Sequence, residues 1–64
     1  MQINLKRIEY EMETRKWSKL RLSIVAGISR QTLWNILNDP GKFHPETVCK
    51  IAQAFDIQAK DLLS

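Results

Sequence analysis

Residues 30–35, with the sequence RQTLWN, carry several polar side chains over one short stretch that is predicted to be helical. If Leu33 marks the buried face, a rotation of about 100° per residue places Gln31 and Asn35 on the opposite side. Arginine can form two hydrogen bonds with guanine, and glutamine or asparagine can do the same with adenine. These side chains therefore have the chemistry to recognise base edges in a major groove, although the same pattern also occurs on ordinary solvated helices.

The rest of the chain offers no set of residues suited to catalysis or to metal binding. His44 is the only histidine and Cys49 the only cysteine, so neither a Cys/His metal site nor an internal disulfide is expected. No nucleophile, base and orienting group can be assembled around His44, which we expect to precede a helix as its N-cap. Cys49 has apolar neighbours and is expected in the core or at its boundary. We therefore expect no enzymatic activity, no metal and no cofactor.

The basic residues are concentrated in the middle of the 64-residue chain. The formal net charge is +3, but residues 15–50 hold seven basic and two acidic residues, and each flanking segment carries −1. Such a concentration favours a polyanionic partner, unless it simply forms a solvated basic face. No apolar run approaches the roughly 18 residues of a membrane span, and the N-terminus does not have the pattern of a signal peptide. We expect a cytoplasmic protein that does not contact a membrane.

Helical periodicity runs through most of the sequence, and turn residues divide it into five segments. We expect helices at about 4–15, 18–26, 29–37, 45–55 and 59–63. In the first four, apolar residues recur every three or four positions, which places them on one face. The predicted fold is all-α, a single small domain over 1–64 that forms a compact bundle of about five short helices. The residues expected to face its core are Leu5, Ile8, Met12, Leu22, Ala26, Leu33, Ile36, Leu37, Val48, Ile51, Ala52 and Phe55.

The connection between the second and third helices is the shortest in the chain. It contains only Gly27 and Ile28, with Ser18 and Ser29 as the expected N-caps of the two helices. Gly27 can adopt the positive φ that often ends a helix, and the small Ser23 lets the two helices approach each other closely. Two helices joined so briefly must meet at a sharp angle, which predicts a helix-turn-helix.

The segment WSKLRLSIVAGISRQTLWNIL, followed by PETVCKIAQAFDI and AKDLL, resembles the helix-turn-helix family of Cro and lambda-repressor-like regulators, also called the XRE family. The resemblance extends from Leu5 to Leu63. It implies that the helix at about 29–37 enters the major groove of double-stranded DNA and that the start of the preceding helix faces phosphates. By position, the residues that would read bases are Arg30, Gln31, Thr32 and Asn35. Those that would contact the DNA backbone are Ser18, Lys19, Ser29, Asn38 and Lys42.

The same resemblance implies a prokaryotic or phage-encoded transcriptional regulator that recognises a specific DNA sequence. The short chain is more similar to a Cro-type repressor than to a two-domain repressor. Such a protein would occupy a roughly palindromic operator as a weak homodimer that is tightened on DNA. Relatives often pair through the loop after the third helix and the C-terminal segment, where Phe43 and Leu63 are the candidates for contact.

Two features depart from the family pattern within the predicted bundle. Met12 and Leu37 stand where many relatives carry an Arg–Glu pair, and we expect these two apolar side chains to touch. Trp34 stands where relatives often have a polar residue. We expect it to pack against Phe43 or to flank the DNA backbone.

The second helix departs from the pattern on its outer face. Leu20 and Ile24 should point away from the core, and Val25 extends the same apolar surface. Two large apolar residues on adjacent turns can mark a protein-contact surface. They leave open an alternative function, a protein-interaction module such as an antitoxin or anti-repressor with a partner at this helix.

Overall fold

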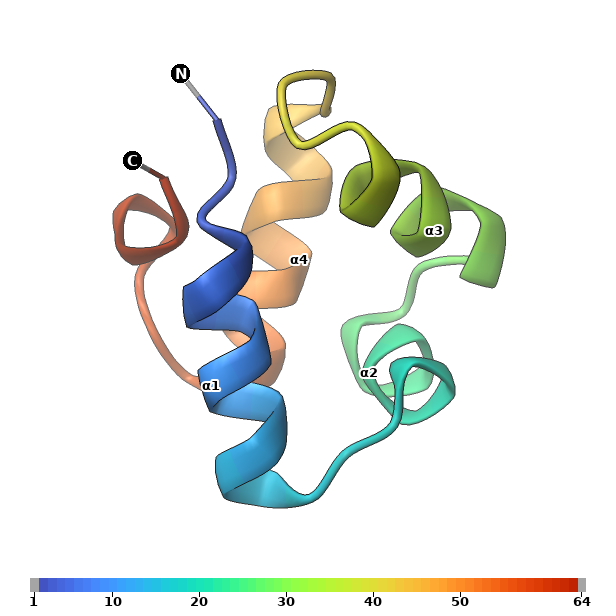
Figure 1. The fold of residues 1–64 in the computed structure, drawn as a ribbon, viewed down its shortest axis with the longest axis vertical. Helices are drawn as coiled ribbons and strands as arrows, with labels where there is room; N and C mark the ends of the chain where they lie inside the picture. The colour runs from blue at the N-terminus through green and yellow to red at the C-terminus, as the bar shows by residue number, and fades with distance from the viewer. Residues whose placement is uncertain (1, 64) are drawn as a thin grey trace.

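A computed structural model describes residues 2–63, and within them the regular structure is helical (Figure 1). The order is α1 (Leu5–Arg15), α2 (Lys19–Ala26), α3 (Arg30–Asn38), α4 (Pro45–Phe55) and a short 3₁₀ helix, η1 (Ala59–Leu62). The all-α bundle is confirmed, and the predicted segments lie within two residues of the observed ones. The last segment differs in type, because it is a single 3₁₀ turn rather than an α-helix.

Side-chain caps explain where the first three helices begin. Asn4, Ser18 and Ser29 each have an extended backbone and accept a hydrogen bond from the N–H three residues later, at 3.2, 3.1 and 3.0 Å. Such bonds satisfy N–H groups that have no partner inside the helix. His44 stands at the N-cap of α4 as expected, but its side chain makes no capping bond there. Pro45 begins that helix with a φ that is already fixed in the helical range.

Three of the helices end on a residue in the left-handed region. Gly27 ends α2 with a φ of 73°, as predicted, but Lys16 and Asp56 end α1 and α4 with φ values of 57° and 58°. In each case the N–H of this residue turns back to carbonyls of the last helical turn. A residue with a Cβ is strained in this conformation, so α1 and α4 end at a cost that α2 avoids.

The core lies between α4 and the other helices. In Figure 1 α1 lies in front of α4, with α2 and α3 on one side of this pair and the C-terminal turn η1 on the other. Phe55, Ile51 and Val48 of α4 are almost fully buried, as are Ile8, Leu22 and Leu33. Most of the predicted core residues are buried here, while Leu5, Met12 and Leu37 are half-buried at its edge.

The two ends of the described chain meet on one side of the bundle (Figure 1). Ile3 forms an isolated antiparallel bridge with Leu63, and the N–H of Asn4 donates to the carbonyl of Leu62 at 2.7 Å. The N–H of Ile3 donates to the carbonyl of Pro40 at 3.0 Å. The first residues therefore fasten the loop after α3 to the C-terminal turn.

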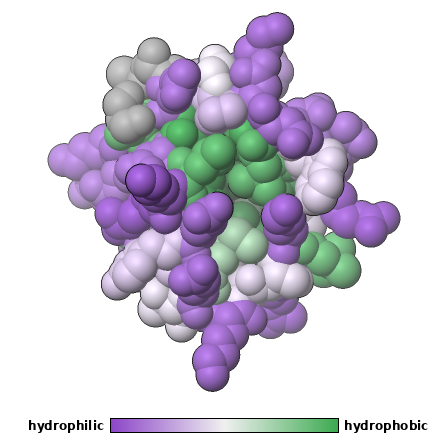
Figure 2. Space-filling view, in the orientation of Figure 1, coloured by the Kyte–Doolittle hydropathy of each residue, from purple (hydrophilic) through white to green (hydrophobic). Residues whose placement is uncertain are grey.

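A groove opens between α1 and the helix-turn-helix. Figure 2 shows apolar residues gathered near the middle of this face, framed by polar side chains. The groove has a volume of about 540 Å³, and both Met12 and Leu37 line it. The structure thus places the two residues on the same apolar surface, while their direct contact stays a prediction.

The position of Cys49 was predicted wrongly. Its side chain is exposed on α4 rather than placed in the core or at its boundary. The buried stripe of this helix is formed by Val48, Ile51, Ala52 and Phe55. Cys49 follows Val48 directly, and a step of about 100° along the helix turns it out of that stripe.

Candidate nucleic-acid interface

The turn between α2 and α3 is closed by its own backbone. The left-handed conformation at Gly27 lets its N–H donate to the carbonyl of Ile24 at 3.2 Å, and the next N–H, of Ile28, donates to Ser23 at 3.0 Å. The Ile28 side chain packs on the core, and Ser23 is buried where the helices approach. The sequence therefore positions α3 on α2 through a short, fully bonded connection, as a helix-turn-helix requires.

Helix α3 has a buried side and a polar side that point in opposite directions. Leu33 is 1% exposed and Ile36 is 2% exposed, so both anchor the helix in the core. Gln31 and Asn35 lie exposed on the other side, and the Nε2 of Gln31 donates a hydrogen bond of 2.9 Å to the Oδ1 of Asn35. The predicted orientation of the polar face is confirmed. The two amide groups remain open to solvent on their other edges.

The start of α3 carries an exposed arginine next to an N-cap serine whose side chain is already hydrogen-bonded. Arg30, its first residue, is exposed. Ser29 accepts from the N–H of Thr32 and also donates its hydroxyl proton to the Thr32 hydroxyl at 2.8 Å. Thr32 is half-buried, so of the base-reading candidates it has the least free surface. Its hydroxyl can still donate outward while it accepts from Ser29.

The candidates for backbone contact frame the polar face of α3. Lys19 begins α2 next to the Ser18 cap, and both side chains are exposed. Asn38 and Lys42 are exposed in the region where α3 ends and the following loop begins. A hollow of about 740 Å³ is lined jointly by Thr32, Asn35, Asn38 and Lys42, among others. The structure thus brings two base-reading candidates together with two backbone candidates.

Few of the basic residues near α2 and α3 are neutralised by ion pairs. Within residues 2–63, the carboxylates that form ion pairs are Glu11 on α1 and Glu46, which lies 3.7 Å from Lys50. The basic residues of this region that form no ion pair with a described carboxylate are Lys16, Lys19, Arg21, Arg30 and Lys42. This leaves a positive field over the surface that carries the polar face of α3, and such a field attracts phosphates.

Trp34 lies in a different environment from the predicted packing against Phe43. The residue is 51% exposed, and the Nζ of Lys19 lies 4.5 Å from the centroid of its ring. Phe43 instead packs against the core, half-buried in the loop before α4. Trp34 follows the buried Leu33 by one residue, about 100° around the helix, and so lies at the edge of the buried face. From there its indole faces Lys19 at the start of α2 rather than the loop that holds Phe43.

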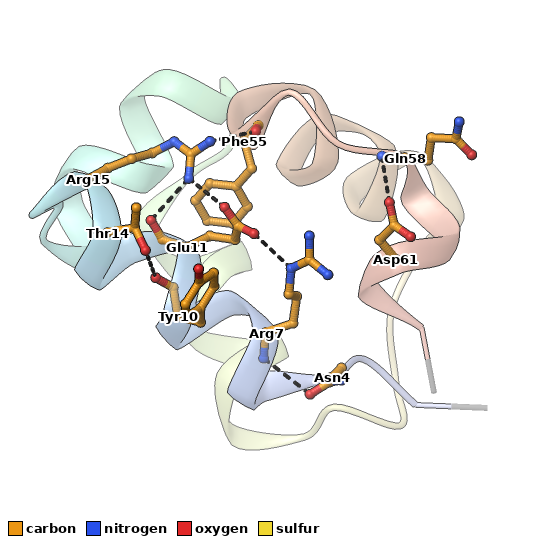
Figure 3. Close-up of polar contacts among 9 residues, drawn as sticks. All are labelled: Asn4, Arg7, Tyr10, Glu11, Thr14, Arg15, Phe55, Gln58 and Asp61. Carbon is orange, nitrogen blue, oxygen red and sulfur yellow. Dashed lines mark hydrogen bonds and ion pairs between the residues drawn. The ribbon is translucent and has the colours of Figure 1, made fainter.

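A buried carboxylate on α1 escaped the sequence analysis. Glu11 is 6% exposed and accepts a hydrogen bond of 2.7 Å from the Nε of Arg7 and one of 2.5 Å from the Nη1 of Arg15 (Figure 3). The hydrogen bond from Arg15 lowers the pKa of Glu11 below its ordinary value, and Arg7 adds to this effect while burial opposes it. The spacing Arg7, Glu11, Arg15 repeats every four residues, and this repeat was the available clue.

Arg15 extends this network to the end of α4. Its Nη2 donates to the carbonyl of Phe55 at 2.7 Å, and its guanidinium lies 5.3 Å from the Phe55 ring and 5.6 Å from the Trp17 ring. The two rings stack with centroids 5.7 Å apart. Arg15 therefore joins the ends of α1 and α4 and is not available for DNA, although it counted toward the basic centre of the sequence.

The four candidates for protein contact fall into two groups. Leu20 and Ile24 on α2 are 49% and 64% exposed, and the neighbouring Val25 is exposed as well. The predicted orientation of this helix face is confirmed. Phe43 and Leu63 are half-buried against the protein's own core. They therefore offer less surface to a second molecule than the α2 residues do.

The described residues were searched for a metal site and for a membrane-spanning helix. Among them, no group of three or more His, Cys, Asp or Glu side chains is placed to hold a metal ion. No helix in this part of the chain combines the length and the apolar character that crossing a bilayer demands.

Comparison with known families agrees with this geometry. A family model described as the Cro/C1-type helix-turn-helix DNA-binding domain matches residues 7–64, from the first turn of α1 through η1. No curated protein and no solved structure matches the chain. The matched residues include both helices of the helix-turn-helix, the exposed polar face of α3 and the nearby lysines and arginines that form no ion pair with a described carboxylate. The chain belongs to the Cro/C1-type helix-turn-helix family of DNA-binding domains.

Proposed function

We propose that the protein is a sequence-specific transcriptional repressor of the Cro type, which inserts α3 into the major groove of an operator. The residues proposed to read base edges are Arg30, Gln31, Thr32 and Asn35. Those proposed to hold the backbone are Ser18, Lys19, Ser29, Asn38 and Lys42. The protein binds as a two-fold dimer that is weak in solution and tighter on DNA, with half-sites about 34 Å apart.

The observation that supports this proposal most strongly is the orientation of α3. Gln31 and Asn35 are exposed directly opposite the buried Leu33. A major groove is wide enough to admit an α-helix, and its base edges carry donor and acceptor patterns that amide side chains can match in pairs. The helix can therefore present its polar side to DNA while its apolar side stays in the core.

Selection of binding sites from random DNA duplexes tests the base-reading role. Gln31→Ala and Asn35→Ala should change the preferred base at defined positions, with a loss of about 1–3 kcal/mol in discrimination for each lost bidentate contact. Gln53→Ala is the matched control, because Gln53 is an exposed glutamine on α4 outside the interface. If both variants select the same sequences as the wild type and the control, the residue assignment is wrong.

Salt dependence tests the backbone contacts. The logarithm of the binding constant should fall linearly with the logarithm of salt concentration, and removing one phosphate-bound lysine should reduce the slope by about one. Lys42→Ala should therefore flatten the dependence equally for all sequences. Lys60→Ala, on the exposed surface of η1, should leave it unchanged. A dependence that is the same in all three proteins would refute the role of Lys42.

A second candidate function is supported by the outer face of α2. Leu20, Ile24 and Val25 leave three large apolar side chains exposed on one short helix, and contiguous apolar surfaces of this kind can mark protein contacts. In this case the protein is an interaction module, such as an antitoxin or anti-repressor. Ile24→Lys would then abolish binding of the protein partner, whereas a DNA-binding repressor should keep its affinity for the selected operator.

A further inference from the structure

The contact between Lys19 and Trp34 joins the two helices of the helix-turn-helix. Lys19 is the first residue of α2 and Trp34 lies in the middle of α3. The ammonium group lies 4.5 Å from the ring centroid, well within the distance at which a cation is attracted to an aromatic face. No hydrogen bond or ion pair to a described residue holds the side chain of Lys19. The indole is therefore its specific contact in this part of the chain.

The place of Trp34 on α3 makes this contact relevant to the interface. The ring lines one shallow hollow of about 500 Å³ together with Arg30 and Gln31. It also lines the larger groove toward α1, together with Lys19 and Asn38. Trp34 thus stands between the side chains proposed to read bases and the lysine proposed to bind a phosphate. Half of its surface stays open even though the ring touches that lysine.

We propose that Trp34 is a positioning residue that holds the Lys19 ammonium at the start of α2, in place to pair with one DNA phosphate. This proposal rests on the proposed DNA-binding function. A free lysine side chain loses rotamer freedom when a phosphate immobilises it, and this loss weakens binding. A lysine that already lies over the indole loses less, and the phosphate it meets fixes the register of α3 on the duplex.

The proposal predicts a uniform loss of affinity when the ring is removed. Trp34→Leu should weaken binding about two- to fivefold, the range expected for an exposed cation–aromatic contact. The selected DNA sequence should not change, because Lys19 contacts a phosphate and not a base. Lys19→Arg should keep most of the affinity, since a guanidinium also stacks on an indole. Tyr10→Leu is the matched control, because Tyr10 is an exposed aromatic on α1.

A double-mutant cycle separates positioning from direct contact. In the Lys19→Ala background, Trp34→Leu should have no further effect on affinity, because its effect acts through the lysine. Equal losses in the two backgrounds would overturn the proposal, since Trp34 would then act on the DNA itself or on the shape of α3. Thermal unfolding of each variant shows whether the fold is kept. Trp34→Phe, which preserves a smaller ring, should give an intermediate affinity.

A measurement without DNA distinguishes this proposal from the proposed function. In the free protein, the NMR signals of the Lys19 Hε protons should be shifted upfield by the indole ring current, and Trp34→Leu should abolish the shift. Unshifted Lys19 protons in the wild type would overturn the positioning role even if the protein binds DNA. If the shift is present but no duplex binds at low salt, the proposed function fails, and the positioning role for a phosphate fails with it.

Discussion

Replacing the buried carboxylate of Glu11 by an amide should destabilise the fold without changing the shape of α1. Glutamine has nearly the same size, but it carries no charge and offers one acceptor oxygen instead of two. In the wild type, Arg7 and Arg15 each donate to a different oxygen of Glu11, at 2.7 and 2.5 Å. Glu11→Gln therefore removes both ion pairs, leaving one arginine donating to a neutral amide oxygen and the other facing the amide NH₂ group, a repulsive contact between donors.

The magnitude follows from the exposure of the three partners. The Glu11 side chain is 8% exposed, whereas those of Arg7 and Arg15 are 36% and 30% exposed. The arginines can therefore return partly to water when their partner is lost, which keeps the cost below that of a fully buried ion pair. A lost hydrogen bond to a charged group costs about 1.5–3 kcal/mol. We expect Glu11→Gln to lower the free energy of unfolding by about 2 kcal/mol, within that range.

Urea denaturation followed by circular dichroism at neutral pH measures this change. In a domain of this size, each kcal/mol corresponds to roughly 4–8 °C in melting temperature, so thermal unfolding gives a second reading. Glu9→Gln is the matched control, because Glu9 is exposed on the same helix and forms no ion pair with a described residue. If Glu11→Gln is no more destabilising than Glu9→Gln, the buried network does not contribute to stability as its geometry indicates.

Three further predictions concern the same helix and the helix ends. Because the pKa of Glu11 is lowered in the folded state from its ordinary value of 4.5, its contribution to stability is present above about pH 4.5 and disappears as the pH falls through the folded value. Urea titrations in acid should therefore bring the wild type and Glu11→Gln together, and a constant difference down to pH 2 would contradict this. Gly27→Ala should destabilise the fold by about 1 kcal/mol, because the positive φ strains any residue with a Cβ although no atom lies within 4 Å of the added carbon. Lys16→Gly should stabilise it by roughly 0.5–1 kcal/mol for the same reason, and equal urea midpoints for this variant and the wild type would refute the account of the α1 end.

The sequence was sufficient to predict the elements that have local rules. The hydroxyl groups of Ser18 and Ser29 suit the N-cap position, and Gly27, which has no Cβ, suits the end of a helix. The helix-turn-helix and its boundaries followed directly from these three residues. The left-handed ends at Lys16 and Asp56 were not predictable in this way. Lysine has no preference for that conformation, and aspartate adopts it more readily than most residues with a Cβ but much less readily than glycine, so neither residue type marks a helix end as Gly27 does.

The candidate site was predicted in its outline and not in its pairings. The exposed face of Gln31 and Asn35 follows from helical periodicity, because Leu33 is apolar and must be buried. The partner of Trp34 did not follow, since it depends on the angle at which α2 and α3 cross. The burial of Glu11 also depends on tertiary structure, because Arg15 must reach the carbonyl of Phe55, forty residues away, to stay beside it.

If the protein reads an operator as proposed, the hydrogen bond between Gln31 and Asn35 has a consequence for how that operator evolves. Each amide group holds the other, so a base pair that draws one of them into a new conformation also releases or constrains the second. In the proposed base-reading role, the preferences at the two DNA positions that Gln31 and Asn35 would face are then interdependent, and the energies of single base changes should not add. A base change at one of these two DNA positions should be compensated best by a base change at the other. Related operators should therefore differ at both positions together.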